Sequence, residues 1–175
     1  MPKRFVPVRE NEQVRLRLLR SSDLQLTLHW RNQDHIRRWF FHSDLITPEQ
    51  HTRWFEQYAE RDDDFVFVIE DVQNGGQPVG QVALYHVDWQ QSRAEFGRLM
   101  IGEDSAAGKG LAFTATQLTL QIAFQSLGLR EVYLEVYADN SRAIAIYTRA
   151  GFQVREHQDQ VIVMFITAGA FDSDR

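Results

Sequence analysis

Two stretches, Ile101–Phe113 (IGEDSAAGKGLAF) and Asp139–Phe152 (DNSRAIAIYTRAGF), decide the fold of this chain. The first stands between an apolar run typical of a strand and an amphipathic run typical of a helix. Its glycines let the backbone approach a ligand closely, and the free N–H groups at the start of a helix attract phosphate. In the second, Asn140 is a good helix N-cap and Gly151 a usual helix stop, so this segment taken alone is consistent with a purely structural helix.

The residues of the glycine turn separate three ways of binding phosphate. A P-loop needs Gly-x-x-x-x-Gly-Lys followed by Ser or Thr. Here Gly102 stands one residue too far from Gly108, and Gly110 replaces the magnesium-binding hydroxyl. A dinucleotide-binding fingerprint needs Gly-x-Gly-x-x-Gly, and Phe113 occupies the third glycine position. The remaining possibility is a site that binds a pyrophosphate mainly through backbone amides, without a metal. The alternative is an ordinary glycine-rich turn that binds no ligand.

The rest of the chain predicts a single domain over residues 1–175, of the α+β or mixed α/β class. Asp23 offers a cap for one helix, and Thr47 followed by Pro48 opens another. Asn74-Gly75-Gly76 is typical of a hairpin turn. Strands are expected at 14–19, 65–69, 79–87, 94–101, 130–137 and 161–167, helices at 24–30, 36–41, 48 to near 62, 111–127 and 141–149, and a frayed tail from 168.

Composition excludes several kinds of chemistry. The chain has 175 residues and no Cys, so a thiolate nucleophile, a disulfide and a Cys-zinc site are excluded, and its six His form no HExxH motif. With 24 acidic and 19 basic residues it lacks the basic surface that nucleic-acid binding needs. The N-terminus has no apolar signal-peptide core, and no run approaches ~18 apolar residues, so a soluble, cytoplasmic protein without a membrane segment is expected.

The order of these parts is more specific than any one of them. A strand, a glycine turn, a long helix, a strand and then Asn-x-x-Ala-x-x-x-Tyr-x-x-x-Gly-Phe (140–152) resembles the GNAT superfamily of acetyl-CoA-dependent N-acetyltransferases. The resemblance implies a central, mostly antiparallel twisted sheet flanked by helices, with strands that splay near 135–137 at the acetyl-CoA site. It also implies acetyl-CoA as cosubstrate and no metal. Residues 105–110 match the family turn Gln/Arg-x-x-Gly-x-Gly/Ala except at Ser105. This difference would affect one side-chain contact to the cofactor, and not the backbone amides that bind the pyrophosphate.

The resemblance assigns cofactor roles to particular residues. Amides from Gly108 to Ala112 would hold the pyrophosphate, and the strand end at 99–101 would pair with the pantetheine arm. Asn140 would bond to the pantetheine, and Arg149 would lie near the adenosine phosphate. The implied cofactor-binding set is Leu99, Met100, Ile101, Ser105, Ala107, Gly108, Lys109, Gly110, Leu111, Ala112, Asn140 and Arg149.

Two residues are candidates for proton transfer. Tyr147 would point at the sulfur, and a phenol with a pKa of about 10 is protonated at neutral pH and can donate to a departing thiolate. Its alternative role is a buried hydroxyl that packs the helix. Glu95 matches an acidic position on the same strand of related acetyltransferases and would take the proton of the ammonium directly or through water. Its alternative is an exposed strand residue.

The acceptor is sought in the run HWRNQDHIRRWF, residues 29–40. Trp-Arg-Asn followed by Ile-Arg resembles a motif of acetyltransferases that act on nucleotide-linked amino sugars. Arginines would meet a diphosphate and aromatic rings would stack on a base or sugar, while the alternative is an amphipathic helix with solvated arginines and buried aromatics. The candidate acceptor-binding residues are Trp30, Arg31, Asn32, Arg37, Tyr85 and His86.

Three other functions stay open at this stage. The same scaffold resembles acetyltransferases of protein N-termini and of polyamines, and a non-catalytic acyl-CoA-binding module belongs to a different class. A peptide acceptor would favour an open groove with acidic side chains, and a nucleotide sugar would favour a confined basic pocket. A homodimer is expected by resemblance only.

Overall fold

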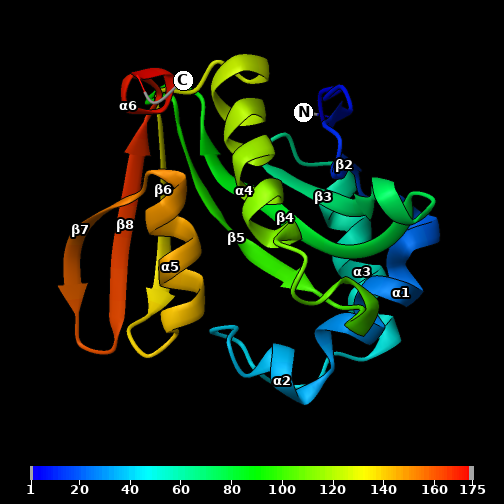
Figure 1. The fold of residues 1–175 in the computed structure, drawn as a ribbon. Helices are drawn as coiled ribbons and strands as arrows, with labels where there is room; N and C mark the ends of the chain where they lie inside the picture. The colour runs from blue at the N-terminus through cyan, green and yellow to red at the C-terminus, as the bar shows by residue number, and fades with distance from the viewer. Residues whose placement is uncertain (1, 174–175) are drawn as a thin grey trace.

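The computed structural model describes residues 2–173, which form one eight-stranded sheet with helices on both faces (Figure 1). The strand order is β1-β2-β3-β4-β5-β6-β8-β7, and only β5 and β6 are parallel neighbours. The strands are β1 (Arg9–Glu10), β2 (Val14–Leu18), β3 (Asp64–Asp71), β4 (Gln77–Asp88), β5 (Arg93–Ile101), β6 (Glu131–Tyr137), β7 (Gln153–Gln158) and β8 (Val161–Thr167). The expected mixed, mostly antiparallel fold is confirmed.

Six α-helices accompany the sheet in the described part of the chain. They are α1 (Leu24–Arg31), α2 (Asp34–Arg37), α3 (Pro48–Ala59), α4 (Leu111–Gln121), α5 (Ser141–Ala150) and α6 (Ala168–Ser173). Short 3-10 turns cover Ser21–Asp23, Val72–Asn74 and Asp104–Ala106, and α4 runs on into a π turn, Ile122–Ser126. No helix within residues 2–173 is both long enough and apolar enough to cross a membrane.

Alternation along β3 sends its side chains into two cores. Phe65, Phe67 and Ile69 lie in the large core with the apolar residues of α4. Val66 and Val68 lie in a second cluster with aromatic residues of α3. Because successive residues of a strand point to opposite faces, the two helices cover opposite faces of the sheet. A strand buried on both faces needs apolar residues throughout, which explains the unbroken run of β3.

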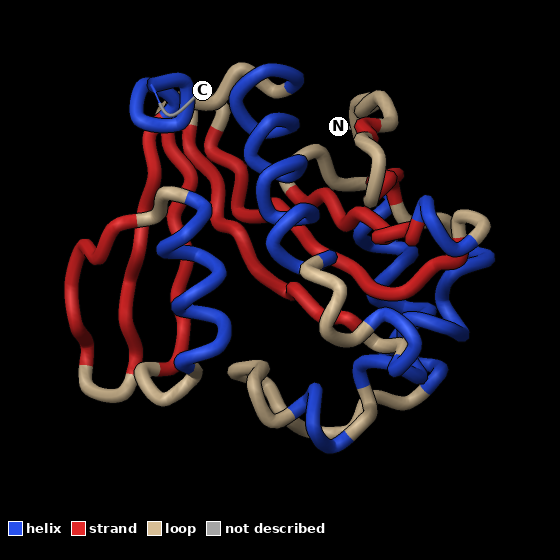
Figure 2. Tube along the Cα trace, in the orientation of Figure 1, coloured by secondary structure: helices blue, strands red, loops and turns tan. Residues whose placement is uncertain are grey.

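The sheet is split between β5 and β6. These strands pair only from Arg93 to Glu95, opposite Glu131 to Tyr133. Figure 2 shows β5 and β6 side by side at one end and diverging toward the other. An extra residue in β5 forms a bulge against β4, with Arg98 at φ 53°, and such bulges bend a strand. The strands therefore separate directly after Tyr133, slightly earlier than the expected position at 135–137.

Two expectations about local structure were wrong, and one strand was not predicted. The helix expected at 36–41 is the shorter α2, which begins at Asp34 and continues only as turns. Strand β7 was missed because all six of its residues are exposed, so it has no apolar alternation to reveal it. The tail from 168 does not fray over its described residues but forms α6, since Phe171 is buried against Phe124.

Candidate active site

The glycine turn ends at the start of α4 with its amide groups unoccupied. Gly108 and Gly110 both have φ 76°, a left-handed conformation that favours glycine. No side chain caps α4, and its first backbone bond runs from the Thr114 N–H to the Gly110 carbonyl at 3.2 Å. The N–H groups of residues 108–113 have no acceptor among the described residues and can bind an anion at the positive end of the helix dipole.

Lys109, in the same turn, points away from any phosphate position. Its Nζ lies 3.0 Å from Oδ2 of Asp71, a carboxylate that is 2% exposed at the end of β3. The lysine charge is therefore compensated within the protein. Its side chain ties the turn to the sheet.

Helix α5 places Asn140 and Arg149 at its two ends. Asn140 is the N-cap, and its Oδ1 accepts a bond from the Ala143 N–H at 3.3 Å. The other half of the amide, Nδ2, has no partner among the described residues and is free to donate. Arg149 lies with its guanidinium 3.9 Å from the centre of the Phe113 ring, in the first turn of α4. A positive charge thus stands beside the free amides of the glycine turn.

Tyr147 lies inside α5, 8% exposed, with its ring edge-on to Phe96 at 5.5 Å and to Phe152 at 5.9 Å. Its hydroxyl makes no hydrogen bond to a described residue. Burial raises the pKa of this phenol above its usual value of 10, so the hydroxyl is protonated at neutral pH. Phe96 belongs to the part of β5 that has left β6, which places Tyr147 beside the split.

The second half of β5 offers a free backbone edge along the split. Leu99, Met100 and Ile101 have no partner strand on the β6 side. On the other side, Met100 and Ile101 pair with Gln81 and Gly80 of β4. Unpaired N–H and C=O groups of an edge can bond to an extended amide-containing chain. The glycine turn follows this edge directly in the sequence.

Glu95 lies at the point where the split begins, on the sheet face opposite to Phe96. Its Oε2 accepts a bond from the Tyr85 hydroxyl at 3.0 Å, and its Oε1 lies 2.9 Å from Nδ1 of His86. Burial, and next the negative charge of Glu95, raise the pKa of Tyr85. His86 is 63% exposed in its side chain, so the Glu95 carboxylate is connected to solvent through an imidazole.

Glu95, Glu135 and Glu156 form an acidic row on this face of the sheet. Glu95 pairs in register with Tyr133, two residues before Glu135, and Glu135 and Glu156 both pair with Val163 of β8. Partial burial raises the pKa of Glu135, and the charges of Glu95 and Glu156 raise it further. Such a row, crossing the split, is suited to a ligand with positive charges.

Three of the candidate acceptor residues are occupied with structural contacts. Trp30 is completely buried, its Nε1 donates to Oε1 of Glu103 at 2.8 Å, and its ring lies against Gly102. The expected stacking of Trp30 on a ligand is therefore wrong. Asn32 exchanges two hydrogen bonds with the backbone of Ile46, and Arg37 pairs with Asp34 at 3.0 Å and donates to the Ser43 carbonyl.

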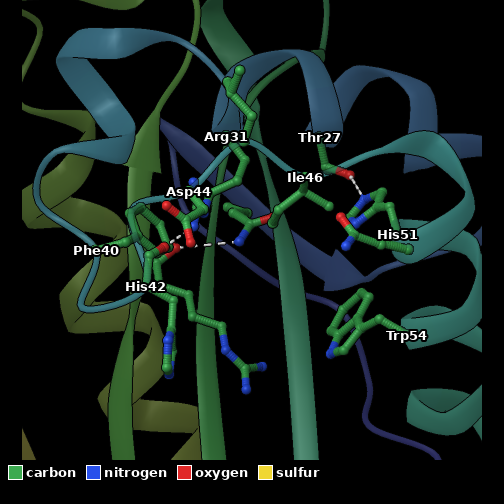
Figure 3. A pocket seen from close by; sticks show the side chains of 12 residues that line it. Thr27, Arg31, Phe40, His42, Asp44, Ile46, His51 and Trp54 are labelled. Atoms are coloured by element: carbon green, nitrogen blue, oxygen red, sulfur yellow. Dashed lines mark hydrogen bonds between the residues drawn. The ribbon is translucent and has the colours of Figure 1, made fainter.

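Arg31 lines a cavity of about 470 Å³ between α1, α3, the loop after α2 and strands β4 and β5. Figure 3 shows Arg31, Thr27, His51 and Trp54 around this cavity. Arg98, also in its lining, pairs with Asp64 at 2.8 Å and lies 4.1 Å from the centre of the Tyr85 ring. Because Tyr85 binds Glu95, the cavity and the acidic row are neighbours joined through Tyr85 and Arg98.

Several residues of the site escaped the sequence analysis. Asp71, Arg98 and Glu135 act through partners that are remote in the sequence, and no local motif marks them. One sequence signal could have found Glu135. In β6, Tyr133 and Glu135 alternate with buried residues, so both lie on the sheet face that also carries Glu95. No group of three or more His, Asp or Glu side chains suited to hold a metal occurs within residues 2–173.

Comparisons with known proteins define the class of this protein. Residues 13–153 match the model of the acetyltransferase (GNAT) domain. The chain is an enzyme that transfers an acyl group to nitrogen, an N-acetyltransferase. It belongs to the GNAT family, as its motifs indicated. An enzyme of this family is therefore preferred to the non-catalytic acyl-CoA-binding module that the sequence left open.

Two relatives are spermidine N-acetyltransferases. The spermidine N(1)-acetyltransferase of Escherichia coli K12 is 30% identical over 141 residues, covering 81% of this chain and 73% of the relative. That of Vibrio cholerae is 27% identical over 147 residues, covering 84% and 83%. Its crystal structure with CoA and spermine has a TM-score of 0.84 at 25% identity, covering 92% of this chain and 99% of the other.

A structure of a nucleotide-linked sugar GNAT is also similar, with a TM-score of 0.82. It is 19% identical and covers 98% of this chain and 94% of the other, a likeness that concerns the fold alone. The subgroup expected from residues 29–40 is thus not the one to which the sequence relatives belong. Those relatives favour the polyamine alternative.

Proposed function

We propose that this chain transfers the acetyl group of acetyl-CoA to a primary amine of a polyamine. One observation carries the proposal: the free edge of β5 leads directly to the uncapped start of α4, and the Tyr147 ring packs against Phe96 of the same strand. Acetyl-CoA, when bound, supplies the thioester that the amine attacks. The shape and donors of the site fit its parts, with amides for the pyrophosphate and an edge for the pantetheine amides.

Each residue of the site then has a separate role in binding or proton transfer. Amides at 108–112 bind the pyrophosphate, Arg149 adds a positive charge beside them, and Nδ2 of Asn140 donates to the pantetheine. Tyr147 holds a proton next to the split and donates it to the leaving thiolate. Glu95 receives the ammonium proton, directly or through water, and His86 connects it to solvent. A polyamine amine with a pKa near 10 is charged at pH 7, so this deprotonation is required.

The acidic row supports a polyamine as the acceptor. An extended polycation has several ammonium groups, and Glu135 and Glu156 continue the row beyond Glu95 across the strands. The spermidine N-acetyltransferase relatives support the same acceptor class. By contrast, the cavity beside Arg31 has an uncompensated positive charge, so a polyamine is expected to follow the row and not to enter that cavity.

A thiol-release assay with acetyl-CoA tests the proposal. Spermidine and spermine are compared with UDP- and dTDP-linked amino sugars and with N-terminal peptides. We expect selective turnover of polyamines, and at least a fivefold higher KM for spermidine in Glu135→Gln or Glu156→Gln. Glu60→Gln, which removes an exposed carboxylate at the end of α3, is the matched control. Selective turnover of a peptide or sugar would overturn the polyamine assignment and leave the enzyme class standing.

The nucleotide-linked amino sugar expected from residues 29–40 is the second candidate. The unpaired guanidinium of Arg31 in its cavity is the observation in its favour. The relatives do not support it, and Trp30 cannot stack on such a ligand.

Assembly and location stay predictions. A structure of the Vibrio cholerae enzyme is described as dodecameric, and it resembles this chain with a TM-score of 0.76 at 23% identity. We expect the homodimer as the minimal assembly, which light scattering coupled to size-exclusion chromatography measures. A cytoplasmic location is expected from the sequence only.

A further inference from the structure

Arg31 carries a buried charge that the protein leaves uncompensated. The residue is 7% exposed, and within residues 2–173 it forms no ion pair with a carboxylate. One guanidinium nitrogen, Nη2, donates to the His42 carbonyl, and the guanidinium lies 4.5 Å from the centre of the Phe40 ring. The other terminal nitrogen, Nη1, is buried and has no hydrogen-bond partner.

A buried cation without a partner is unusual, because removing a charge from water is costly unless another charge or acceptor replaces the water. Within residues 2–173, the other unpartnered buried side-chain atom is Nε of Arg93. Arg93 differs because its Nη2 pairs with Glu131 at 3.3 Å. For Arg31, burial and the nearby charge of Arg37 lower the pKa, with only a smaller opposing effect from Asp44.

The rest of the cavity lining provides no ion-pair partner for Arg31. Arg98 is the other strong cation, and it is already paired with Asp64. His51 bonds to Thr27 at 3.0 Å, and burial and then Arg31 lower its pKa, so it is neutral at pH 7. Asp44 is the one carboxylate of the lining; it is exposed and makes no ion pair with Arg31.

The loop over the cavity is fixed before any ligand arrives. Asn32 holds Ile46 by two hydrogen bonds of 2.8 and 2.9 Å, and Arg37 holds the Ser43 carbonyl at 2.8 Å. These contacts keep the walls apart, so that a volume of about 470 Å³ remains next to Arg31. A cavity of this size suits a small organic molecule.

We propose that this cavity is an anion-binding subsite, in which the guanidinium of Arg31 binds a carboxylate or phosphate group. The guanidinium fork matches the oxygens of both groups. The ligand supplies the negative charge that Arg31 lacks as an ion-pair partner, and Phe40, Ile46 and Trp54 line the cavity around its apolar part. The anion is either a substituent of the acceptor amine or a separate small molecule that binds beside it. This site is independent of the polyamine assignment.

The test measures binding and not turnover. Inorganic phosphate and citrate are titrated by calorimetry, at constant ionic strength, into the wild type, Arg31→Met and Arg38→Gln. Arg38 is the matched control, because it is an exposed arginine of the same segment that lies over Trp39 and does not line the cavity. Binding at the glycine turn is common to the three proteins and cancels in the comparison.

We expect saturable binding by the wild type and by Arg38→Gln, and at least a tenfold loss of affinity for one of the anions in Arg31→Met. Ile46→Trp keeps Arg31 but fills the cavity, and it is expected to show the same loss if Arg31→Met does not fold. Equal affinity of the wild type and Arg31→Met, or of the wild type and Ile46→Trp, would overturn the subsite. So would the absence of saturable binding by the wild type.

Steady-state kinetics then distinguish the two sources of the anion. If the anion is part of the acceptor, phosphate inhibits competitively against the acceptor, and the inhibition disappears in Arg31→Met. If it is a separate ligand, phosphate changes the rate at saturating acceptor, again only when Arg31 is present. An enzyme that is inactive with polyamines but still binds phosphate through Arg31 would refute the proposed acceptor and leave the subsite intact.

Discussion

At the scale of single residues, the site depends on side chains whose surroundings set their protonation. Tyr147 is buried between Phe96 and Phe152 with a free hydroxyl, and its pKa is raised by burial. Glu95 instead accepts bonds from Tyr85 and His86 and is linked to solvent. Tyr147 therefore keeps its proton at neutral pH, as the proposed proton donor requires.

Replacing Tyr147 by Phe tests the proton donor. The ring packing against Phe96 and Phe152 is retained, while the donated proton is lost, so we expect kcat to fall by about 100-fold or more. The KM for acetyl-CoA should stay within about twofold of the wild type in the thiol-release assay, since pyrophosphate contacts are untouched. An unchanged kcat would remove the donor role.

The pH profile of the wild type has a defined direction. A donor acts in its protonated form, so the rate falls as pH rises through its pKa. Because burial raises the pKa of Tyr147 above 10, the fall attributable to this residue lies above pH 10. We expect kcat to show no Tyr147-dependent decline between pH 7 and 9 when wild type and Tyr147→Phe are compared, and a decline in that range would contradict the assignment.

The Lys109–Asp71 pair is expected to stabilise the glycine turn. Lys109→Met leaves the buried Asp71 carboxylate without its partner, and we expect a loss of about 1–3 kcal/mol in the free energy of unfolding. Asp71→Asn in the same chain should recover part of that loss, because no buried charge is then unpaired. Urea denaturation of the two single variants and the double variant measures the coupling, and strictly additive losses would refute it.

At the scale of elements, the start of α4 combines two properties that a ligand site needs. Gly108 and Gly110 hold the turn in a left-handed conformation, and the absence of a capping side chain leaves amides free. A helix cap would stabilise α4 but would occupy those amides. Lys109 stabilises the turn through its ion pair with Asp71, a contact that leaves the amides at the start of α4 free.

Gly110→Ala tests the conformation of that turn. A Cβ at position 110 would meet no atom within 4 Å, so any effect arises from φ 76° and not from a clash. We expect a cost of about 1–2 kcal/mol and a severalfold higher KM for acetyl-CoA, because the backbone shifts to relieve the strain. Gly169→Ala in α6, at a glycine without positive φ, should leave that KM unchanged. A wild-type KM in Gly110→Ala would show that the left-handed turn is not needed.

At the scale of the whole molecule, the C-terminal segment closes the large core. Phe171 is 6% exposed and packs against Phe124 of the π turn after α4. We expect Phe171→Ala to lower the free energy of unfolding by about 3 kcal/mol, as for a large buried side chain, with little change in KM for acetyl-CoA. Urea denaturation decides this, and a change below about 0.5 kcal/mol would indicate that α6 adds nothing to stability.

Much of the fold could be predicted because its signals are local. Thr47 and Pro48 begin α3, Gly151 ends α5, and the alternation around Val132 and Leu134 marks β6. β7 could not be predicted, since its backbone bonds to β8 stabilise it without any apolar face. α6 depends on contacts such as that of Phe171 with Phe124, between residues far apart in the sequence.

The sequence by itself determined the class of this protein and the pieces of its cofactor site. Glycine spacing, a helix cap and a tyrosine two turns later in α5 are local properties, and they specify how a short segment meets a ligand. The tertiary structure alone decided which charges remain uncompensated. Trp30 became core, Lys109 was neutralised by Asp71, and Arg31 was left buried without an ion pair to any described carboxylate. Electrostatic compensation depends on distances between remote segments, and those exist only in the folded chain.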